Sequence, residues 1–406
     1  MNEYLELLHY TLICLSLFLL LNRFQKKNSE LFLDYSTYLL IFGLFYFSIP
    51  SIVAVSSGVS LIGSSMQTIE YTAFIGLYFN SIFLLFFYIS TKSDKCKLAF
   101  NFQLTSSSSI RKLVISLTSL IAIYVMFILV KDLTYLTDIY NNRRLQADYD
   151  YILMSVFKMY FLSKIQIILI SYLFFTTKKM KYLVYFAPFL LIDILLSGRD
   201  LLFAFILLTF MMLAFLQSKL TIKYILLPIV ALIFIGIIRS NNVLEWSDIV
   251  MALGEFNYTW ATTHIIYDSN VINDWKSMLV YSFFKIFPGG VYQIIFGEYN
   301  HYHEVITRDN PFAHGLAGSV ISEALSFKNI VITSITPILI ALYGYLINSL
   351  LKIDSVFSKT LFIVAILYIH PIIRFTFYEY IFYPFYLMIF FGLWIALLDS
   401  KRVKRI

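Results

Sequence analysis

The sequence has few of the residues that a soluble globule or a disulfide-rich secreted domain would need. Only two of its 406 residues are cysteines, Cys14 and Cys96, and neither suggests a disulfide framework or a metal site. Charged residues make up 14% of the chain and hydrophobic residues 60%, with a mean hydropathy of +0.78. This composition excludes a soluble globular protein. The first apolar run, 4–22, has no basic n-region and no small-residue cleavage site, so we expect a retained helix rather than a signal peptide.

Apolar runs of membrane-spanning length recur along the whole chain. A helix needs roughly 20 apolar residues to cross the hydrocarbon core, and helices satisfy their own backbone hydrogen bonds there. The sequence therefore predicts an all-α polytopic membrane protein, one helical domain over 1–406, with about eleven transmembrane helices. The expected spans are 4–22, 31–49, 70–90, 113–130, 155–177, 182–197, 201–217, 222–238, 329–351, 358–373 and 376–398.

Lysine and arginine concentrate in alternate connections, which sets an expected orientation. By the positive-inside rule the N-terminus lies outside and the C-terminus in the cytoplasm, so the net charge of +7 mostly reflects membrane orientation and nucleic acid is not an expected partner. The semi-polar segment 239–328 then becomes one large extracytoplasmic loop. Within it, 278–296 is apolar but broken by Lys285 and by a Pro-Gly-Gly run, which favours a re-entrant hairpin or interfacial helices over another span.

Four arginines are expected at the outer surface, where the positive-inside rule would deplete them. A guanidinium binds phosphate oxygens in a bidentate manner and stays charged at any working pH. The alternative is snorkelling at helix ends or pairing with nearby carboxylates such as Asp200. Taken together, the four favour a binding site for a membrane-anchored anion, most naturally a lipid diphosphate: Arg199, Arg239, Arg308 and Arg374.

The polar stretch 308–323 carries the candidate catalytic residues. His314 precedes Gly315 and is the candidate general base, because only histidine titrates near neutrality without help; the alternative is a hydrogen-bonding loop histidine. Asp309 could hold Arg308 or orient His314, and Glu323 could act as an alternative base. His301 and His303 form a His-x-His pair, but no third ligand set supports a metal there, so none is predicted.

A transporter is the rival hypothesis, because ionisable residues also occur inside expected spans. Proton-coupled transport uses such groups, here Lys158, Lys164, Asp193 and Glu379. They occur singly, whereas a transporter predicts charges distributed over several spans and repeated halves. The aromatic residues of the large loop suit stacking on sugar rings and equally suit an interfacial belt.

The layout resembles the O-antigen or capsule repeat-unit polymerases of the Wzy type, relatives of the O-antigen ligases. Many spans precede one large late outer loop, arginines (Arg199, Arg239) sit at outer span ends, and a His/Gly-bearing stretch at 311–323 closes the loop. The resemblance implies a GT-C-like glycosyltransferase of the bacterial cytoplasmic membrane. It would transfer the growing glycan from undecaprenyl diphosphate onto a new lipid-linked repeat unit at the outer leaflet.

The same resemblance makes His314 the counterpart of the ligases' catalytic histidine. It implies no nucleotide cofactor and no metal, because the sugar diphosphate is already activated and arginines can neutralise the leaving group. The expected partners are undecaprenyl-diphosphate-linked oligosaccharides, membrane lipids and a chain-length regulator. The alternatives are a lipid-linked oligosaccharide flippase or other transporter, and a ligase-type glycosyltransferase, which shares the machinery but uses a different acceptor.

Overall fold

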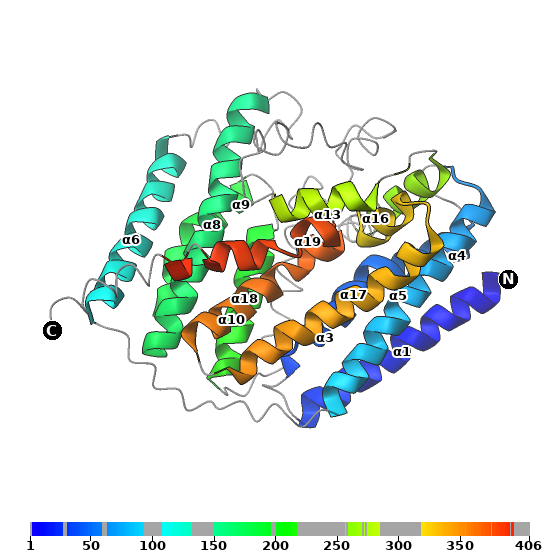
Figure 1. The fold of residues 1–406 in the computed structure, drawn as a ribbon, viewed down its shortest axis with the longest axis horizontal. Coiled ribbons are helices and arrows are strands. Elements are labelled where there is room, and N and C mark those ends of the chain that lie inside the picture. Colours follow the sequence, from blue (N-terminus) through cyan, green and yellow to red (C-terminus); the bar gives the residue numbers. More distant parts are fainter. Residues whose placement is uncertain are drawn as a thin grey trace, which may run out of the picture. The chain divides into compact units, whose positions relative to one another are not determined.

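The computed structural model describes most of the chain, and its regular elements there are all helices, with no strand among the described residues (Figure 1). The described residues are 2–26, 31–58, 63–92, 108–131, 149–195, 200–216, 256, 259–269, 272, 274–284, 318–353, 355–374, 376–389 and 391–393.

The chain divides into two compact units, each built from segments distant in sequence. Unit 1 comprises Met1–Lys97, Val250–Ser349 and Tyr368–Tyr386; unit 2 comprises Leu98–Ile249, Leu350–Leu367 and Leu387–Ile406. The large loop expected at 239–328 therefore contributes mostly to unit 1.

Unit 1 contains the first helices of the chain together with the end of the large loop. Its elements are α1 (Asn2–Lys26), α3 (Tyr35–Gly43), η1 (Leu44–Ser48), α4 (Ile49–Ser57), α5 (Met66–Lys92), a helix at 259–268, α13 (Trp275–Phe284), α16 (Val320–Ser326), α17 (Ile330–Ser349), α19 (Ile369–Arg374) and α20 (Phe377–Tyr380). Unit 2 contains α6 (Ser108–Lys131), α8 (Tyr149–Thr177), η2 (Met180–Phe186), α9 (Ala187–Leu195), α10 (Asp200–Phe215), η3 (Leu350–Lys352) and α18 (Val356–Leu367).

Six helical stretches among the described residues are long and apolar enough to cross a membrane, and three shorter apolar helices accompany them. The six are Glu3–Lys26, Tyr35–Ser57, Met66–Thr91, Ser108–Lys131, Ile330–Lys352 and Val356–Arg374. The prediction of an all-α membrane protein is confirmed. The count of about eleven spans stays a prediction, and the expected span 222–238 lies outside the described residues.

Several helix limits differ from those expected from hydropathy. The second span continues to Ser57 rather than 49 because Pro50 falls in the first turn of α4, where its missing N–H is not needed. The wider π-helical turn η1 precedes it. Gly58 then ends α4 in the left-handed region, with φ +63°, and its N–H donates to Ala54 O over 3.1 Å. The expected span at 182–197 starts instead as the 3₁₀ helix η2 and becomes α-helical at α9.

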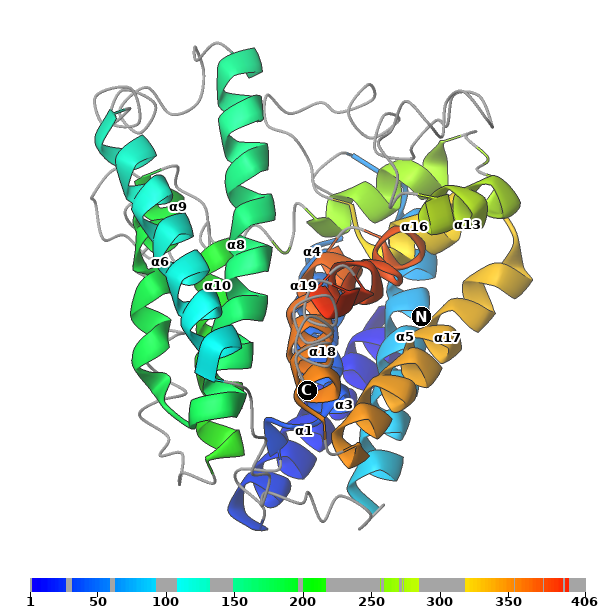
Figure 2. The same ribbon diagram turned by 60° about the vertical axis from the view of Figure 1, so that its left-hand side comes forward.

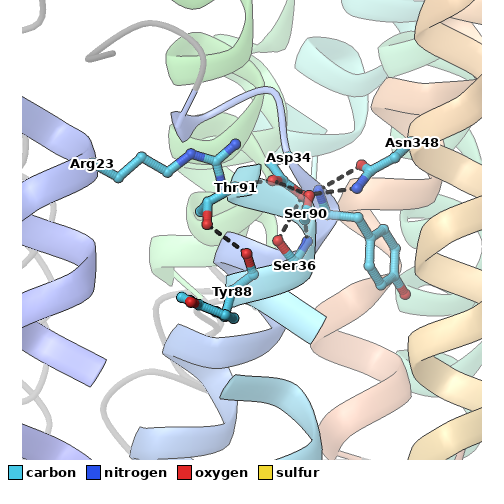
Figure 3. A network of polar contacts seen from close by, with 8 residues as sticks. Arg23, Asp34, Ser36, Tyr88, Ser90, Thr91 and Asn348 are labelled. Atoms are coloured by element: carbon cyan, nitrogen blue, oxygen red, sulfur yellow. Dashed lines mark hydrogen bonds and ion pairs between the residues drawn. The ribbon is translucent and has the colours of Figure 1, made fainter. Parts of the chain in front are cut away.

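A buried polar network joins four helices at one end of unit 1, which we call the basic end (Figure 3). The Asp34 carboxylate accepts from Nη1 of Arg23 over 2.6 Å, at the end of α1. It also accepts from Oγ of Ser90 over 2.6 Å, near the end of α5, and from Nδ2 of Asn348 over 2.8 Å, near the end of α17. Because Asp34 itself is the N-cap residue of α3, the chain direction alternates between α1, α3–α4 and α5.

The opposite end of unit 1, the loop end, is formed by residues of the large loop. The Thr68 hydroxyl, near the start of α5, donates to the Asp268 carboxylate over 2.7 Å. The Lys328 ammonium donates to the backbone oxygens of Ile266 and Tyr267, over 2.7 Å each, and so ends the helix at 259–268. The Figure 1 and Figure 2 views both show α17 along α5.

Glycine allows α17 to approach α3 and α5 closely. A Cβ atom at Gly344 would lie 2.5 Å from Cδ1 of Tyr35 and 2.9 Å from Cε1 of Phe86. These rings are held in the core of unit 1, and Tyr35 is fully buried. Helix pairs in membranes use small residues in this way to bring their backbones together.

Gly344→Val should therefore destabilise the protein by about 1–3 kcal/mol, the usual cost of overpacking a filled core. Thermal unfolding of the purified protein in detergent measures this as a lowered midpoint. The matched control is Leu346→Val, because Leu346 lies on the same helix with 62% of its surface exposed. Equal midpoints for the two variants would show that α17 does not depend on this contact.

Unit 2 uses two buried polar side chains to fix its helices. The Gln166 amide donates to Thr118 O over 3.2 Å and to Tyr185 O over 3.0 Å. Asp193 accepts from the N–H groups of Leu201 and Leu202, over 3.0 and 3.2 Å, and so caps the start of α10. Asp193, one of the intramembrane acids considered for transport, thus has a structural role.

Candidate functional site

The last segment of the large loop folds into the short helix α16, which starts with a capping box. Ser319 Oγ accepts from the N–H of Ser322 over 3.0 Å, and Ser322 Oγ accepts from the N–H of Ser319 over 2.7 Å. Serine thus replaces the glutamate or glutamine usual at the second position. The box directs the next residue, Glu323, into the interior of unit 1, where every residue of α16 is buried.

Glu323 is the central residue of this site, and its two carboxyl oxygens have different surroundings. The side chain is fully buried, and Oε2 accepts from the N–H of Phe377 over 2.6 Å. This bond caps α20, whose own N-cap residue, Thr376, provides no side-chain cap. In contrast, Oε1 is buried and has no hydrogen-bond partner in the described part of the chain.

Burial raises the pKa of Glu323 to about 8, although the N–H groups of Phe377 and Tyr378 act in the opposite direction. At neutral pH the carboxyl is therefore mostly protonated and can ionise with a small change of pH. Several buried side-chain atoms have no hydrogen-bond partner among the described residues, and Oε1 of Glu323 is the one carboxyl oxygen in that set. The arrangement fits a group that exchanges a proton with a ligand.

The helix at 259–268 supports α16 from the loop end. Thr263 Oγ1 lies 3.1 Å from Ser319 Oγ, so the two helices meet at the capping box. On the same helix, Trp260 packs against α5, where its Cη2 would lie 2.9 Å from a Cβ at Gly76. Burial lowers the pKa of His264 to about 4, with Asp268 acting in the opposite direction, so its imidazole is neutral at physiological pH.

Arg374 lies at the end of α19, next to the segment that Glu323 binds. Only residues 375 and 376 separate it from Phe377, whose N–H donates to Glu323. Arg374 is half-buried and is the last residue of its helix. Two of the seven predicted site residues, one acid and one arginine, are thus attached to the same short connection.

The remaining predicted site residues lie outside the described residues: Arg199, Arg239, Arg308, Asp309 and His314. His301 and His303 lie outside them as well. No cluster of three or more His, Cys, Asp or Glu side chains that could hold a metal occurs among the described residues. Of the intramembrane candidates, Lys164 is half-buried in α8, and the side chains of Lys158 and Glu379 lie outside the described part.

The sequence did not predict a buried hydrogen bond between Tyr46 and His370, a residue on the same helix as Arg374. The Tyr46 hydroxyl, on η1, lies 2.9 Å from Nε2 of His370, on α19. His370 stands one helical turn before Arg374, so both lie on one face of α19. The available signal was this i, i+4 spacing of a histidine and an arginine; nothing in the sequence indicated the tyrosine 324 positions away.

No family model, curated protein or solved structure matches this chain. The functional assignment consequently rests on the residues and their geometry.

Proposed function

We propose that this chain is an integral-membrane glycosyltransferase that polymerises an O-antigen or another surface polysaccharide. It transfers the growing glycan from undecaprenyl diphosphate onto a new lipid-linked repeat unit, at the outer leaflet of the bacterial cytoplasmic membrane. The observation that carries the proposal is the buried Glu323 carboxyl, with one oxygen held by a backbone N–H and the other without a described partner. Its pKa suits proton transfer near neutrality.

The arrangement of unit 1 supports the placement of this chemistry. Glu323 and the helix at 259–268 lie at the loop end, whereas Arg23 and the polar network around Asp34 lie at the opposite end. With the basic connections in the cytoplasm, the loop end faces outward and the N-terminus lies outside. A lipid-linked glycan whose diphosphate sits at the outer leaflet would then lie at the end of unit 1 that contains α16.

The reaction needs a base and a positively charged site, and the chain offers both. The acceptor hydroxyl oxygen bonds to the anomeric carbon, the bond from that carbon to the diphosphate oxygen breaks, and its electron pair leaves with the diphosphate. The hydroxyl proton passes to His314 or Glu323, with Asp309 as a supporting acid. The leaving charge is neutralised by the proposed diphosphate-binding arginines, namely Arg199, Arg239, Arg308 and Arg374.

A strain without this gene should make surface polysaccharide of only one repeat unit, because polymerisation is lost while each unit is still built and exported. A silver-stained gel resolves chain length, and the wild-type gene should restore the ladder. Arg199→Ala, Arg239→Ala and His314→Ala should each fail to restore it although the protein reaches the membrane at wild-type levels.

Other band patterns identify the rival functions. Loss of even the single repeat, with lipid-linked units accumulating inside the cell, indicates a flippase. Full-length polymer that stays on the lipid carrier indicates a ligase. An unchanged ladder means that the protein acts on something else, and restoration by all three variants removes the site assignment.

A further inference from the structure

Helix α19 has only six residues, and a turn at Tyr368 separates it from α18, so its position depends on contacts with other helices. Pro371 lacks an N–H and its ring clashes with the carbonyl four residues earlier, which separates α19 from α18 at Tyr368. Hydrogen bonding resumes at Ile372, whose N–H donates to Tyr368 O over 2.9 Å. A helix this short takes its orientation from the contacts that hold it.

His370 provides the contact at the start of α19. Its ring lies 5.5 Å from that of Phe42 and 5.9 Å from that of Tyr46, which are one turn apart along α3 and η1. Its Nε2 is hydrogen-bonded to the Tyr46 hydroxyl over 2.9 Å. Both side chains are buried, so water does not compete for this bond.

The π-helical turn that carries Tyr46 is stabilised from α5. The Asn80 amide donates to Gly43 O over 3.1 Å and to Ser48 Oγ over 2.6 Å, at the two ends of η1. Single π-helical turns inside α-helices occur frequently at functional sites. Here the turn carries Tyr46, whose hydroxyl meets His370.

A second contact follows the end of α19: the Phe377 N–H, at the start of α20, donates to Glu323. Arg374 therefore lies between two anchored positions, the His370 side chain one turn before it and the Phe377 N–H three residues after it. An arginine that must meet a diphosphate in a fixed geometry benefits from such support, because small misplacements weaken bidentate contacts.

We propose that Tyr46 and His370 are positioning residues for Arg374: their hydrogen bond fixes α19 so that the Arg374 guanidinium binds the diphosphate of the lipid-linked glycan. The inference rests on the proposed function, since that function supplies the diphosphate. It assigns to this pair an effect on substrate binding rather than on the chemical step.

The test measures binding of undecaprenyl diphosphate to the full chain in lipid nanodiscs. Tyr46→Phe should raise its Kd by about three- to tenfold, the effect of losing one buried hydrogen bond. His370→Ala should do the same, and His370→Gln, which keeps a polar atom near the position of Nε2, should recover most of the affinity. In a polymerisation assay, Tyr46→Phe should raise KM and change kcat by less than about twofold.

Two controls separate positioning from general damage. Tyr38 lies on α3, which directly precedes η1, and its buried hydroxyl donates to Phe32 O over 2.8 Å. Tyr38→Phe removes this hydroxyl and should leave Kd unchanged. Tyr46→Phe combined with Arg374→Ala should bind no more weakly than Arg374→Ala alone, because the tyrosine acts through the arginine.

Additive effects in that double variant, or an unchanged Kd in Tyr46→Phe, would overturn the inference and leave the proposed function standing. A wild-type chain that neither binds undecaprenyl diphosphate nor polymerises would remove the proposed function, and this inference with it. Melting temperatures of all variants identify any loss of binding that comes from unfolding.

Discussion

Replacing Glu323 with glutamine should abolish polymer formation while the protein stays folded in the membrane. Glutamine has nearly the same shape, and its amide oxygen can still accept from the N–H of Phe377, so the cap on α20 remains. What disappears is the group that takes up and releases a proton. Loss of a general base lowers the rate by about 10²-fold or more, which on a gel of surface polysaccharide leaves single-repeat species.

Glu323→Ala separates the two roles of this residue. It removes both the proton-exchanging group and the cap, so it should lower the melting temperature as well as the activity. Ser326→Ala is the matched control, because Ser326 is buried on the same helix and donates to Glu323 O within the turn. A full-length ladder in Glu323→Gln would show that Glu323 only caps α20, and would leave His314 as the candidate base.

The raised pKa of Glu323 also predicts how activity and stability depend on pH. With a pKa of about 8, the ionised form needed by a base increases about tenfold per pH unit up to that value, and the rate should follow. The stability of the folded protein changes with pH in the opposite direction. Between the ordinary pKa of about 4.5 and about 8, the folded protein binds a proton that the unfolded chain has lost, so stability falls as pH rises through this window.

Melting curves of wild type and Glu323→Gln, recorded between about pH 4.5 and pH 8, measure how stability depends on the ionisation of Glu323. The variant should gain stability relative to wild type as pH rises toward about 8, by no more than about 1.4 kcal/mol per pH unit, and the difference should level off above it. Parallel curves for the two proteins would mean that Glu323 titrates near its ordinary pKa. The polymerisation rate should then be flat over the same range unless another group is the base.

Hydropathy alone predicted the positions of the six described helical stretches that are long and apolar enough to cross a membrane, because burial in lipid requires long apolar runs irrespective of tertiary contacts. It could not predict where they end. The continuation of the second span to Ser57 depends on the position of Pro50 relative to a π-helical turn, and that turn depends on Asn80 from another helix. Local chemistry and a tertiary contact override hydropathy there.

The candidate site, too, was predictable from the sequence only in part. The polar composition of 308–323 drew attention to this stretch and named Glu323 as an alternative base to His314, a role that stays a prediction. Its partner, the N–H of Phe377, lies 54 residues away and is a backbone group, which no side-chain pattern reveals. The Tyr46–His370 pair was missed for a similar reason: each residue alone fits an ordinary span, and only the fold joins them.

Asp34→Ala should cause the largest loss of stability of any substitution at the basic end, about 3–5 kcal/mol. Besides Arg23, Ser90 and Asn348, the Asp34 carboxylate accepts from the N–H and the hydroxyl of Ser36, over 2.9 and 2.7 Å. Removing it leaves the Arg23 guanidinium, only 12% exposed, as an unpaired buried charge. Four helix ends then lose their common acceptor, so the protein should accumulate poorly and melt at a much lower temperature.

The Arg23→Met and Asp34→Asn double variant tests whether the Arg23–Asp34 ion pair or the hydrogen bonds to residue 34 hold the four helices together. Removing both charges spares the cost of burying one alone, so the double variant should recover much of the stability that either single variant loses.

Burial by itself would raise the pKa of Asp34, but Arg23 and the donated hydrogen bonds outweigh it and hold that pKa below its ordinary value of 3.8. The carboxylate therefore stabilises the fold fully above about pH 4, and the contribution is lost as pH falls through the lowered pKa. The difference in melting temperature between wild type and Asp34→Asn should accordingly be constant near neutral pH and become smaller only in acid. A gap that narrows at neutral pH, or a double variant less stable than both singles, would mean that hydrogen-bond connectivity rather than the ion pair holds the four helices together.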